Sequence, residues 1–398
     1  MKNLLLLITV WPLAAISTPT DPLVVISDTQ SQSSAIQSRT SLPTTQAHKN
    51  TAEEPDISQV SPSSAPARHQ PGVKGATAYR DTRAYGSFSV PYTSKRVSHL
   101  HTSQVSSSSN AYLSATYPYR AIGKLTFNAD GYDSFCSATL IRRGVIVTAA
   151  HCIQDFGAGD STYSDFQFTP ASYKGSAPYG TWSARAYVWP GSWADGSDVG
   201  WGGGGGAAVD NDLAVIAIAR NAAGQFIGDL TGYLSYGWNN YSFIKHRLTG
   251  NLWVGAITTL GYPGLLDEGE ILQRTDGPAY LTTISGAGQI YRGSNLTGGS
   301  SGGPWIANFG YENPGYSSGA NTGKAATNNV IVGVTSWADI DPNVAKNLFA
   351  SQFRVNSRYP NADYGGFGGG NIGSLVYQIC NYKPDDSTQS FKDMGYCD

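Results

Sequence analysis

Short apolar or alternating runs, separated by clusters of glycine, asparagine and aspartate, follow one another along the chain from Tyr117 onward. Such a pattern is typical of strands joined by turns, so it predicts an all-β sandwich or barrel rather than alternating strands and helices. Only the segment Ile372 to Cys380, whose apolar residues lie three and four positions apart, predicts a helix. The runs that we expect to form strands cover residues 121–127, 138–148, 213–219, 252–260 and 330–337.

The chain before this β-rich part has a different pattern. Lys2, the apolar run Leu4 to Val10 and the small residues after Pro12 fit a secretory signal peptide over residues 1–17. This run is shorter than the roughly 20 apolar residues that cross a bilayer, and no later segment reaches that length. We therefore expect a secreted protein without a membrane anchor.

Residues 18–110 are rich in serine, threonine, glutamine and proline and contain almost no aromatic side chains before Tyr79. Such a segment buries too little apolar surface to offset its chain entropy, so we expect it to be disordered. A pro-region, a glycosylated stalk and a linker share this composition, which does not separate them.

The composition limits the possible functions. The 398 residues include 26 basic and 28 acidic side chains, for a net charge of −2, which argues against a nucleic-acid-binding protein. Only 14% of residues are charged while 47 are glycine, so turns are expected to be frequent and long charged helices rare.

All four cysteines lie in the β-rich part, at Cys136, Cys152, Cys380 and Cys397. An even number behind a signal peptide predicts two disulfides. Three connectivities are possible, and the short sequence separations favour Cys136 with Cys152 and Cys380 with Cys397. Neither pair has the spacing of a zinc site, so we expect no metal and no cofactor.

Three short motifs could carry chemistry. His151 closes a strand within 148–152, Asp212 leads an apolar strand, and Ser301 lies in the glycine-rich segment 298–304. Each also has an ordinary structural interpretation, as a strand-end histidine, a turn aspartate or a flexible loop. A nucleophilic serine needs an exposed hydroxyl and converging backbone N–H groups, which flanking glycines permit. A buried carboxylate needs a partner, and a histidine N–H would serve.

Together and in this order, the motifs resemble those of the trypsin-like (chymotrypsin-fold) serine peptidases. The segments 117–125 and 261–264 look more like the secreted glutamyl-endopeptidase-like branch than like digestive trypsins. The resemblance covers about residues 117–380. It implies two antiparallel Greek-key β-barrels with the active site between them and a short C-terminal helix, in a peptidase domain over residues 111–398.

The resemblance also implies roles. Ser301 would be the nucleophile, His151 the general base and then acid, and Asp212 the group that orients the imidazole. The N–H groups of Gly299 and Ser301 would form the oxyanion hole. Ser300 is the rival nucleophile, but it falls on the variable position of the motif. The Cys136–Cys152 disulfide would fix the histidine against the nucleophile.

The substrate pocket is predicted in the same way. Asn295 would lie at its floor, and the strand with Thr335, Ser336, Trp337 and Ala338 would pair with the substrate backbone. Asn295 does not support a preference for lysine or arginine. Thr335 stands where glutamyl-specific relatives carry a histidine, and Ala338 replaces a glycine. We expect cleavage after a neutral residue.

Activation departs from the trypsin pattern. Ser300 occupies the position of the aspartate that pairs with the new N-terminus in trypsins, and no Arg-Ile-Val-Gly-Gly sequence exists. If residues 18–110 are the pro-region of a zymogen, we expect them to cover the site or to assist folding.

The leading hypothesis is a secreted, extracellular serine endopeptidase that acts as a monomer on protein or peptide substrates, without nucleic-acid or membrane partners. The alternative is a catalytically silent relative that acts as a secreted binding protein. A surface adhesin with a stalk is disfavoured by the missing anchor. The glycine-rich segments 152–212 and 307–329 are expected to be surface loops, and His246 to be a solvent-facing loop residue.

Overall fold

The structure is a computed structural model. It describes residues 23–27, 94–98, 113–198, 210–245, 247, 251–284, 287–312, 327–338 and 346–398. The expected signal peptide, most of residues 18–110 and His246 lie outside these ranges. Within them, no helix has the length and apolar character needed to span a bilayer.

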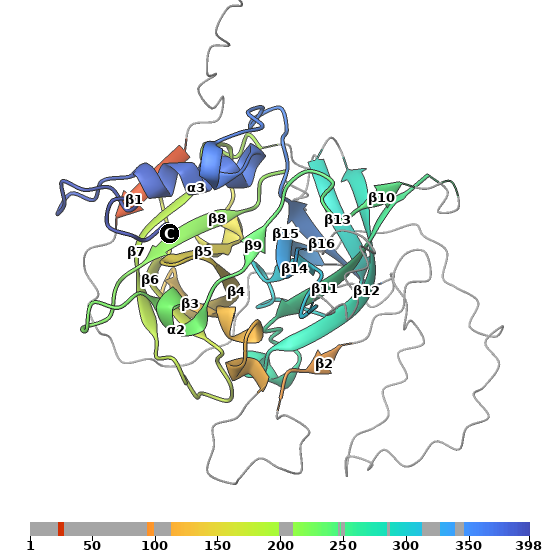
Figure 1. The fold of residues 1–398 in the computed structure, drawn as a ribbon, viewed down its shortest axis with the longest axis horizontal. Coiled ribbons are helices and arrows are strands. Elements are labelled where there is room, and N and C mark those ends of the chain that lie inside the picture. Colours follow the sequence, from red (N-terminus) through yellow and green to blue (C-terminus); the bar gives the residue numbers. More distant parts are fainter. Residues whose placement is uncertain are drawn as a thin grey trace, which may run out of the picture.

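Six antiparallel strands close into a first barrel, seen on the left of Figure 1. They follow the order β7-β6-β3-β4-β5-β8, and β8 pairs back with β7. All five residues of β8 are buried, as expected for an apolar run inside a closed barrel. The strands are β3 (Ile122–Ala129), β4 (Tyr132–Arg142), β5 (Val145–Thr148), β6 (Ser164–Pro170), β7 (Trp182–Pro190) and β8 (Ala214–Ile218).

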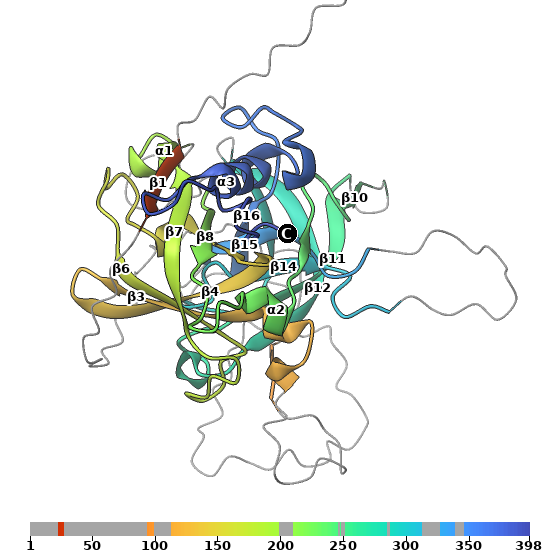
Figure 2. The same cartoon turned by 60° about the vertical axis from the view of Figure 1, so that its left-hand side comes forward.

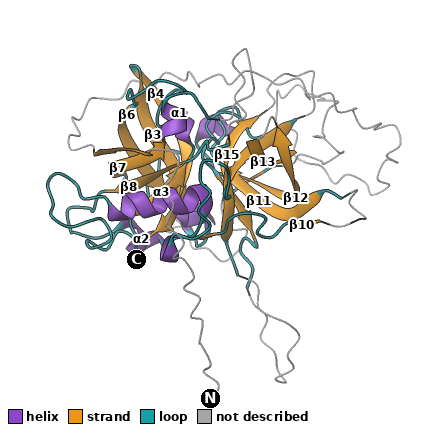
Figure 3. Cartoon of the chain, turned by 90° about the horizontal axis from the view of Figure 1, so that it is seen from above, coloured by secondary structure: helices purple, strands orange, loops and turns teal. Residues whose placement is uncertain are grey.

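Six further antiparallel strands close a second barrel beside the first (Figures 1 and 3). Their order is β11-β14-β15-β16-β13-β12, with β12 back on β11. The strands are β11 (Trp253–Gly261), β12 (Gln273–Ile284), β13 (Ala287–Gly293), β14 (Pro304–Ala307), β15 (Val330–Ala338) and β16 (Asn347–Gln352). Short strands also add to this sheet: β9 (Ser235–Tyr236) pairs with β15, β10 (Ile244–Lys245) pairs with β11, and β2 (Lys95–Arg96) pairs with β12. The predicted two-barrel, all-β fold is confirmed.

Two sequence expectations were wrong in detail. The run 138–148 is not one strand, because the chain turns at Arg143 and Gly144 between β4 and β5. The segment 152–212 is not a surface loop throughout, because β6 and β7 belong to the first barrel. Its aromatic residues, such as Phe168 and Trp189, are fully buried. Glycines and polar residues surround these aromatic residues, so the sequence pattern did not indicate the strands β6 and β7.

The predicted C-terminal helix is confirmed as α3 (Gly370–Asn381). It lies across β7 and β8 of the first barrel (Figure 1) and buries Ile372, Leu375, Val376 and Ile379. The other helices are single turns: α1 (Gly191–Ala194), α2 (Ile227–Thr231), and the 3-10 turns η3 (Leu113–Ala115), η4 (Tyr119–Ala121), η5 (Ala150–Cys152), η7 (Asp267–Gly269) and η8 (Gly365–Phe367).

Two strands come from the region before residue 111. β1 (Leu23–Ser27) runs antiparallel to β7 on the first barrel, where it is visible in Figure 2. β2 (Lys95–Arg96) runs antiparallel to the start of β12 on the second barrel. Parts of the 18–110 region therefore have regular backbone structure, which their overall composition did not predict.

Candidate active site

His151 and Asp212 come together at the end of the first barrel. His151 lies in η5, directly after β5, and Asp212 lies two residues before β8. β5 and β8 are paired neighbours, with Thr148 opposite Ala214. His151 follows β5 and Asp212 precedes β8, so both lie at the same end of this strand pair. His151 Nδ1 lies 2.8 Å from Asp212 Oδ2, and the His151 backbone N–H donates to Oδ1 at 3.0 Å.

The Asp212 carboxylate is almost completely buried and is fully engaged. Its third hydrogen bond comes from the Ser336 hydroxyl, which donates to Oδ2 at 2.5 Å. A buried carboxylate is stable only with such partners, and these three donors fix its orientation toward the imidazole. Burial lowers the pKa of His151, but the charge and hydrogen bond of Asp212, with a smaller effect of Asp155, outweigh it and raise that pKa.

The loop that carries Asp212 is anchored by residues that the sequence did not single out. Asn211 donates through its backbone and its side-chain amide to the buried Asp198, at 2.7 and 3.0 Å. Its side-chain oxygen accepts hydrogen bonds from Asn356 and Asn371 at 2.8 and 3.1 Å. Because Asn356 and Asn371 are more than a hundred residues away in sequence, no local pattern could have indicated them.

The glycines around Ser301 bring its loop against the histidine segment. A side chain at Gly302 would put its Cβ 2.1 Å from Thr148 Oγ1 and 2.8 Å from the Ala149 nitrogen. Gly302 also has a φ of +75°, which favours glycine. The residue after Ser301 therefore touches the chain two to three positions before His151. A side chain there would push the two loops apart.

Ser137 joins the two barrels beneath this loop. Its hydroxyl donates to the Gly299 carbonyl and accepts from the Tyr262 N–H, both at 2.9 Å. Its backbone N–H donates to the Ser301 carbonyl at 2.8 Å. Gly299 has a φ of +93° and no room for a Cβ, which would lie 2.4 Å from Phe135. No sequence motif indicated a role for Ser137, although it directly follows Cys136.

The two neighbouring serines differ in environment. Ser300 is 1% exposed, and its hydroxyl donates to the Thr297 carbonyl. Ser301 is partly exposed. Among the described residues, the backbone N–H groups of Gly299 and Ser301 donate to no protein acceptor. Two unused donors beside a partly exposed hydroxyl are what an oxyanion hole requires.

Both predicted disulfides are confirmed. Cys136 of β4 is bonded to Cys152 of η5, with Cα atoms 6.2 Å apart, and Cys380 of α3 is bonded to Cys397. The first bond ties the histidine segment to the strand that carries Ser137. Ligand atoms of Cys136, His151 and Cys152 lie within 4.8 Å of one another, but the disulfide occupies both sulfurs and makes them unsuitable metal ligands.

The residues expected in the substrate pocket are mostly engaged elsewhere. The Thr335 hydroxyl accepts from Trp305 Nε1 at 3.0 Å in the core of the second barrel. Trp337 stacks on Phe349 with ring centroids 3.8 Å apart. The Asn295 side-chain oxygen is buried without a protein donor among the described residues. Ala338 is partly buried, and the chain directly after it lies outside the described ranges.

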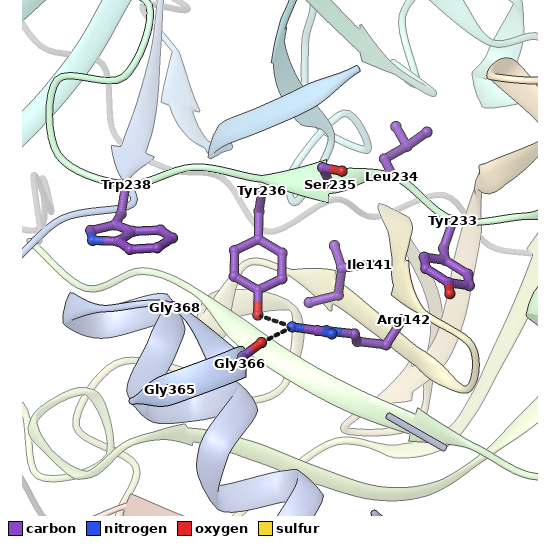
Figure 4. A pocket seen from close by; sticks show the side chains of 10 residues that line it. All are labelled: Ile141, Arg142, Tyr233, Leu234, Ser235, Tyr236, Trp238, Gly365, Gly366 and Gly368. Carbon is purple, nitrogen blue, oxygen red and sulfur yellow. Dashed lines mark hydrogen bonds between the residues drawn. The ribbon is translucent and has the colours of Figure 1, made fainter. Parts of the chain in front are cut away.

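A separate cavity of about 280 Å³ lies away from these residues (Figure 4). It is bounded by the β4 end, by the connection between the barrels and by the turn η8. Arg142 spans it and donates to the Tyr236 hydroxyl at 3.1 Å and to the Gly366 carbonyl. Its lining includes none of His151, Asp212 and Ser301.

No protein-family model matches the chain, and comparison with curated proteins finds no match. Similar solved structures include the protease Anisep from Arthrobacter nicotinovorans, at 22% identity and a TM-score of 0.44, covering 59% of this chain and 91% of that one. A thermostable serine protease, AL20, from an extremophilic microorganism has 22% identity and a TM-score of 0.44, with coverages of 59% and 92%. A Glu endopeptidase in complex with MPD has 18% identity and a TM-score of 0.43, with coverages of 66% and 92%. The two-barrel fold of the chain follows from its own strand pairing.

Proposed function

We propose that this protein is a secreted serine endopeptidase that forms an acyl-enzyme on Ser301. The observation that carries the proposal is the buried Asp212 carboxylate, which binds both the backbone and Nδ1 of His151 while the Ser301 loop packs against the same segment. A catalytically silent binding protein would not need this arrangement. No described feature favours that alternative.

The proposed mechanism starts from the contact between Asp212 and His151. Asp212 holds the proton of His151 on Nδ1, which leaves Nε2 free to accept the proton of the Ser301 hydroxyl. The serine oxygen then attacks the substrate carbonyl carbon, and the N–H groups of Gly299 and Ser301 stabilise the resulting oxyanion. The imidazolium returns its proton to the leaving amine, and water hydrolyses the acyl-enzyme by the same path.

The substrate is proposed to be a protein or peptide in extended conformation. β14 pairs with β15 only up to Val334, whereas β16 pairs with β15 as far as Ala338. No described strand therefore covers the edge from Ser336 to Ala338 that faces away from β16. An extended peptide could add to this edge. The neutral Asn295 side chain supports cleavage after a neutral residue.

A fluorophosphonate probe tests the chemistry. We expect it to label the wild-type protein and the matched control Ser300→Ala, and not to label Ser301→Ala. Labelling that persists in Ser301→Ala, or an unlabelled wild-type protein, would contradict the proposal. Profiling with a peptide library tests the substrate preference, and dominant cleavage after lysine, arginine or glutamate would contradict it.

A further inference from the structure

Strand β2 contains two adjacent basic residues on the surface of the second barrel. The side chains of Lys95 and Arg96 are 65% and 64% exposed. Within residues 1–112 they are the only two consecutive lysine or arginine residues. Two adjacent cations in an extended segment suit an endoprotease whose pockets carry carboxylates.

The residue after this pair belongs to the barrel. Val97 is 1% exposed, and its backbone N–H donates to the Leu272 carbonyl at 2.8 Å. The Ser98 carbonyl accepts from the Leu113 N–H at 2.8 Å, which links Val97 to the start of the continuous fold. Burial therefore begins at Val97, directly after the exposed basic pair.

Arg96 is the main side-chain attachment of β2. Its Nε donates to Asp267 Oδ2 at 2.8 Å, and its second nitrogen donates to the other carboxylate oxygen. Lys95 makes only a distant ion pair with Asp276, at 4.0 Å. The strand has two residues, so local opening must break this bidentate pair, two ladder positions and the Val97–Leu272 hydrogen bond before another protein can bind the segment.

We propose that the Arg96–Val97 peptide bond is the processing site of this protein, cut in trans by an endoprotease specific for paired basic residues. Water adds across the bond, leaving a carboxylate on Arg96 and an amino group on Val97. The inference rests on the proposed function in one respect, since it takes the chain to be a secreted precursor. Self-cleavage is not invoked, because Asn295 offers no carboxylate for a basic residue.

Processing here would cut the chain between the exposed Arg96 and the buried Val97. Val97 keeps its contacts with the second barrel and becomes the first residue of the mature protein. Everything before it loses its covalent link. The upstream strand β1 (Leu23–Ser27) would then be held without a covalent link, by its pairing with β7 and its position beside α1 and α3.

The test begins with the secreted full-length chain. N-terminal sequencing and intact mass should give Val97 as the first residue, and Lys95→Ala should abolish that end while leaving the Arg96–Asp267 pair intact. Arg83→Ala, a single basic residue upstream, is the matched control and should process normally. Another N-terminus in the wild type, or a Val97 end in Lys95→Ala, would overturn the proposal.

A second measurement tests whether the Arg96–Asp267 pair limits cleavage. The unprocessed Ser301→Ala chain, incubated with a dibasic-specific endoprotease, should be cut after Arg96. Asp267→Asn should be cut about two- to fivefold faster, since a partly exposed ion pair makes opening less frequent. Asp276→Asn, where the 4.0 Å pair with Lys95 is the side chain's contact with β2, should leave the rate nearly unchanged. Equal rates for the wild-type and Asp267→Asn backgrounds, or no cut at this bond, would contradict the inference.

Failure of this inference is distinguishable from failure of the proposed function. A protein that the fluorophosphonate labels but that begins elsewhere than Val97 contradicts the processing site alone. A protein that begins at Val97 but remains unlabelled contradicts the peptidase activity alone.

Discussion

The catalytic end of the candidate site, formed by His151, Asp212, Gly299 and Ser301, differs from its specificity end, formed by Asn295, Thr335, Trp337 and Ala338. At the catalytic end, His151 and Asp212 are hydrogen-bonded to each other, and the backbone N–H groups of Gly299 and Ser301 have no acceptor among the described residues. At the specificity end, the Thr335 hydroxyl and the Trp337 ring are used by the second barrel for its own packing.

The residues at the two ends therefore meet different requirements, one for the geometry of the proposed reaction and one for the stability of the barrel. The proposed acyl transfer would need a fixed geometry. Hydrogen bonds of Ser137 with Gly299 and of Ser336 with Asp212 join the two barrels and hold these segments together. Thr335 and Trp337 of the specificity end stabilise the second barrel whatever the substrate is. Substitutions at the catalytic end should therefore reduce the rate, and those at the specificity end should reduce mainly the stability.

The largest effect is expected for Asp212→Asn. The amide would no longer hold the His151 proton on Nδ1, and kcat should fall by about 10⁴-fold. Steady-state kinetics on a peptide substrate measures the loss, and circular dichroism with thermal unfolding checks that the fold is kept. A loss below tenfold in a folded variant would show that Asp212 does not orient the base.

The next largest effect is expected for Gly302→Ala. The added Cβ would clash with Thr148 Oγ1 at a position whose φ is +75°, so the Ser301 loop must move and kcat should fall by about 100-fold. Gly310→Ala is the matched control, because its φ of +71° is similar but nothing lies within 4 Å of the added Cβ. Equal losses in both variants would attribute the effect to backbone strain instead of loop contact.

The pH dependence tests the His151 environment. The raised pKa of His151 means that the imidazole is protonated, and useless as a base, up to a higher pH than an ordinary histidine. Below that pKa, kcat/KM should fall about tenfold for each pH unit, and the midpoint should lie above about 6.5. A midpoint at or below that value in the free enzyme would contradict the direction of the shift.

Ser137→Ala should have a smaller effect. It leaves the Gly299 carbonyl and the Tyr262 N–H without their partner and loosens the oxyanion loop. We expect kcat to fall by about tenfold, because an unpaired buried group costs about 1–3 kcal/mol. Ser114→Ala is the control, since that buried hydroxyl has no partner among the described residues. If both variants keep full kcat, Ser137 does not position the loop.

The smallest effect on activity is expected for Thr335→Val. The substitution removes the acceptor of Trp305 Nε1 and should lower the free energy of unfolding by about 1–3 kcal/mol, with an unchanged cleavage profile. Thr335→Ser keeps the hydroxyl and should behave like the wild type. A changed residue preference in the peptide-library profile would place Thr335 in the pocket after all.

Sequence patterns predicted the strands best where apolar residues ran without interruption. The runs that became β8, β11 and β15 were found within about two residues, which is the usual uncertainty of element boundaries. The strands β6 and β7 were missed because their buried aromatics are embedded in a glycine-rich segment. Strand β1 was missed because regional composition outweighed a local run of branched apolar residues.

By itself, the sequence led to the proposed class of chemistry through the motifs of His151, Asp212 and Ser301, and it predicted the pairing of the cysteines, which the structure confirms. Local motifs suffice for these because each depends on residues close together in the chain. Only the tertiary structure decided that Ser336 and Ser137 hold the catalytic end and that Thr335 faces the core. The Ser336 and Ser137 bonds join residues 124 and 162 positions apart, and chain folding alone brings such residues together.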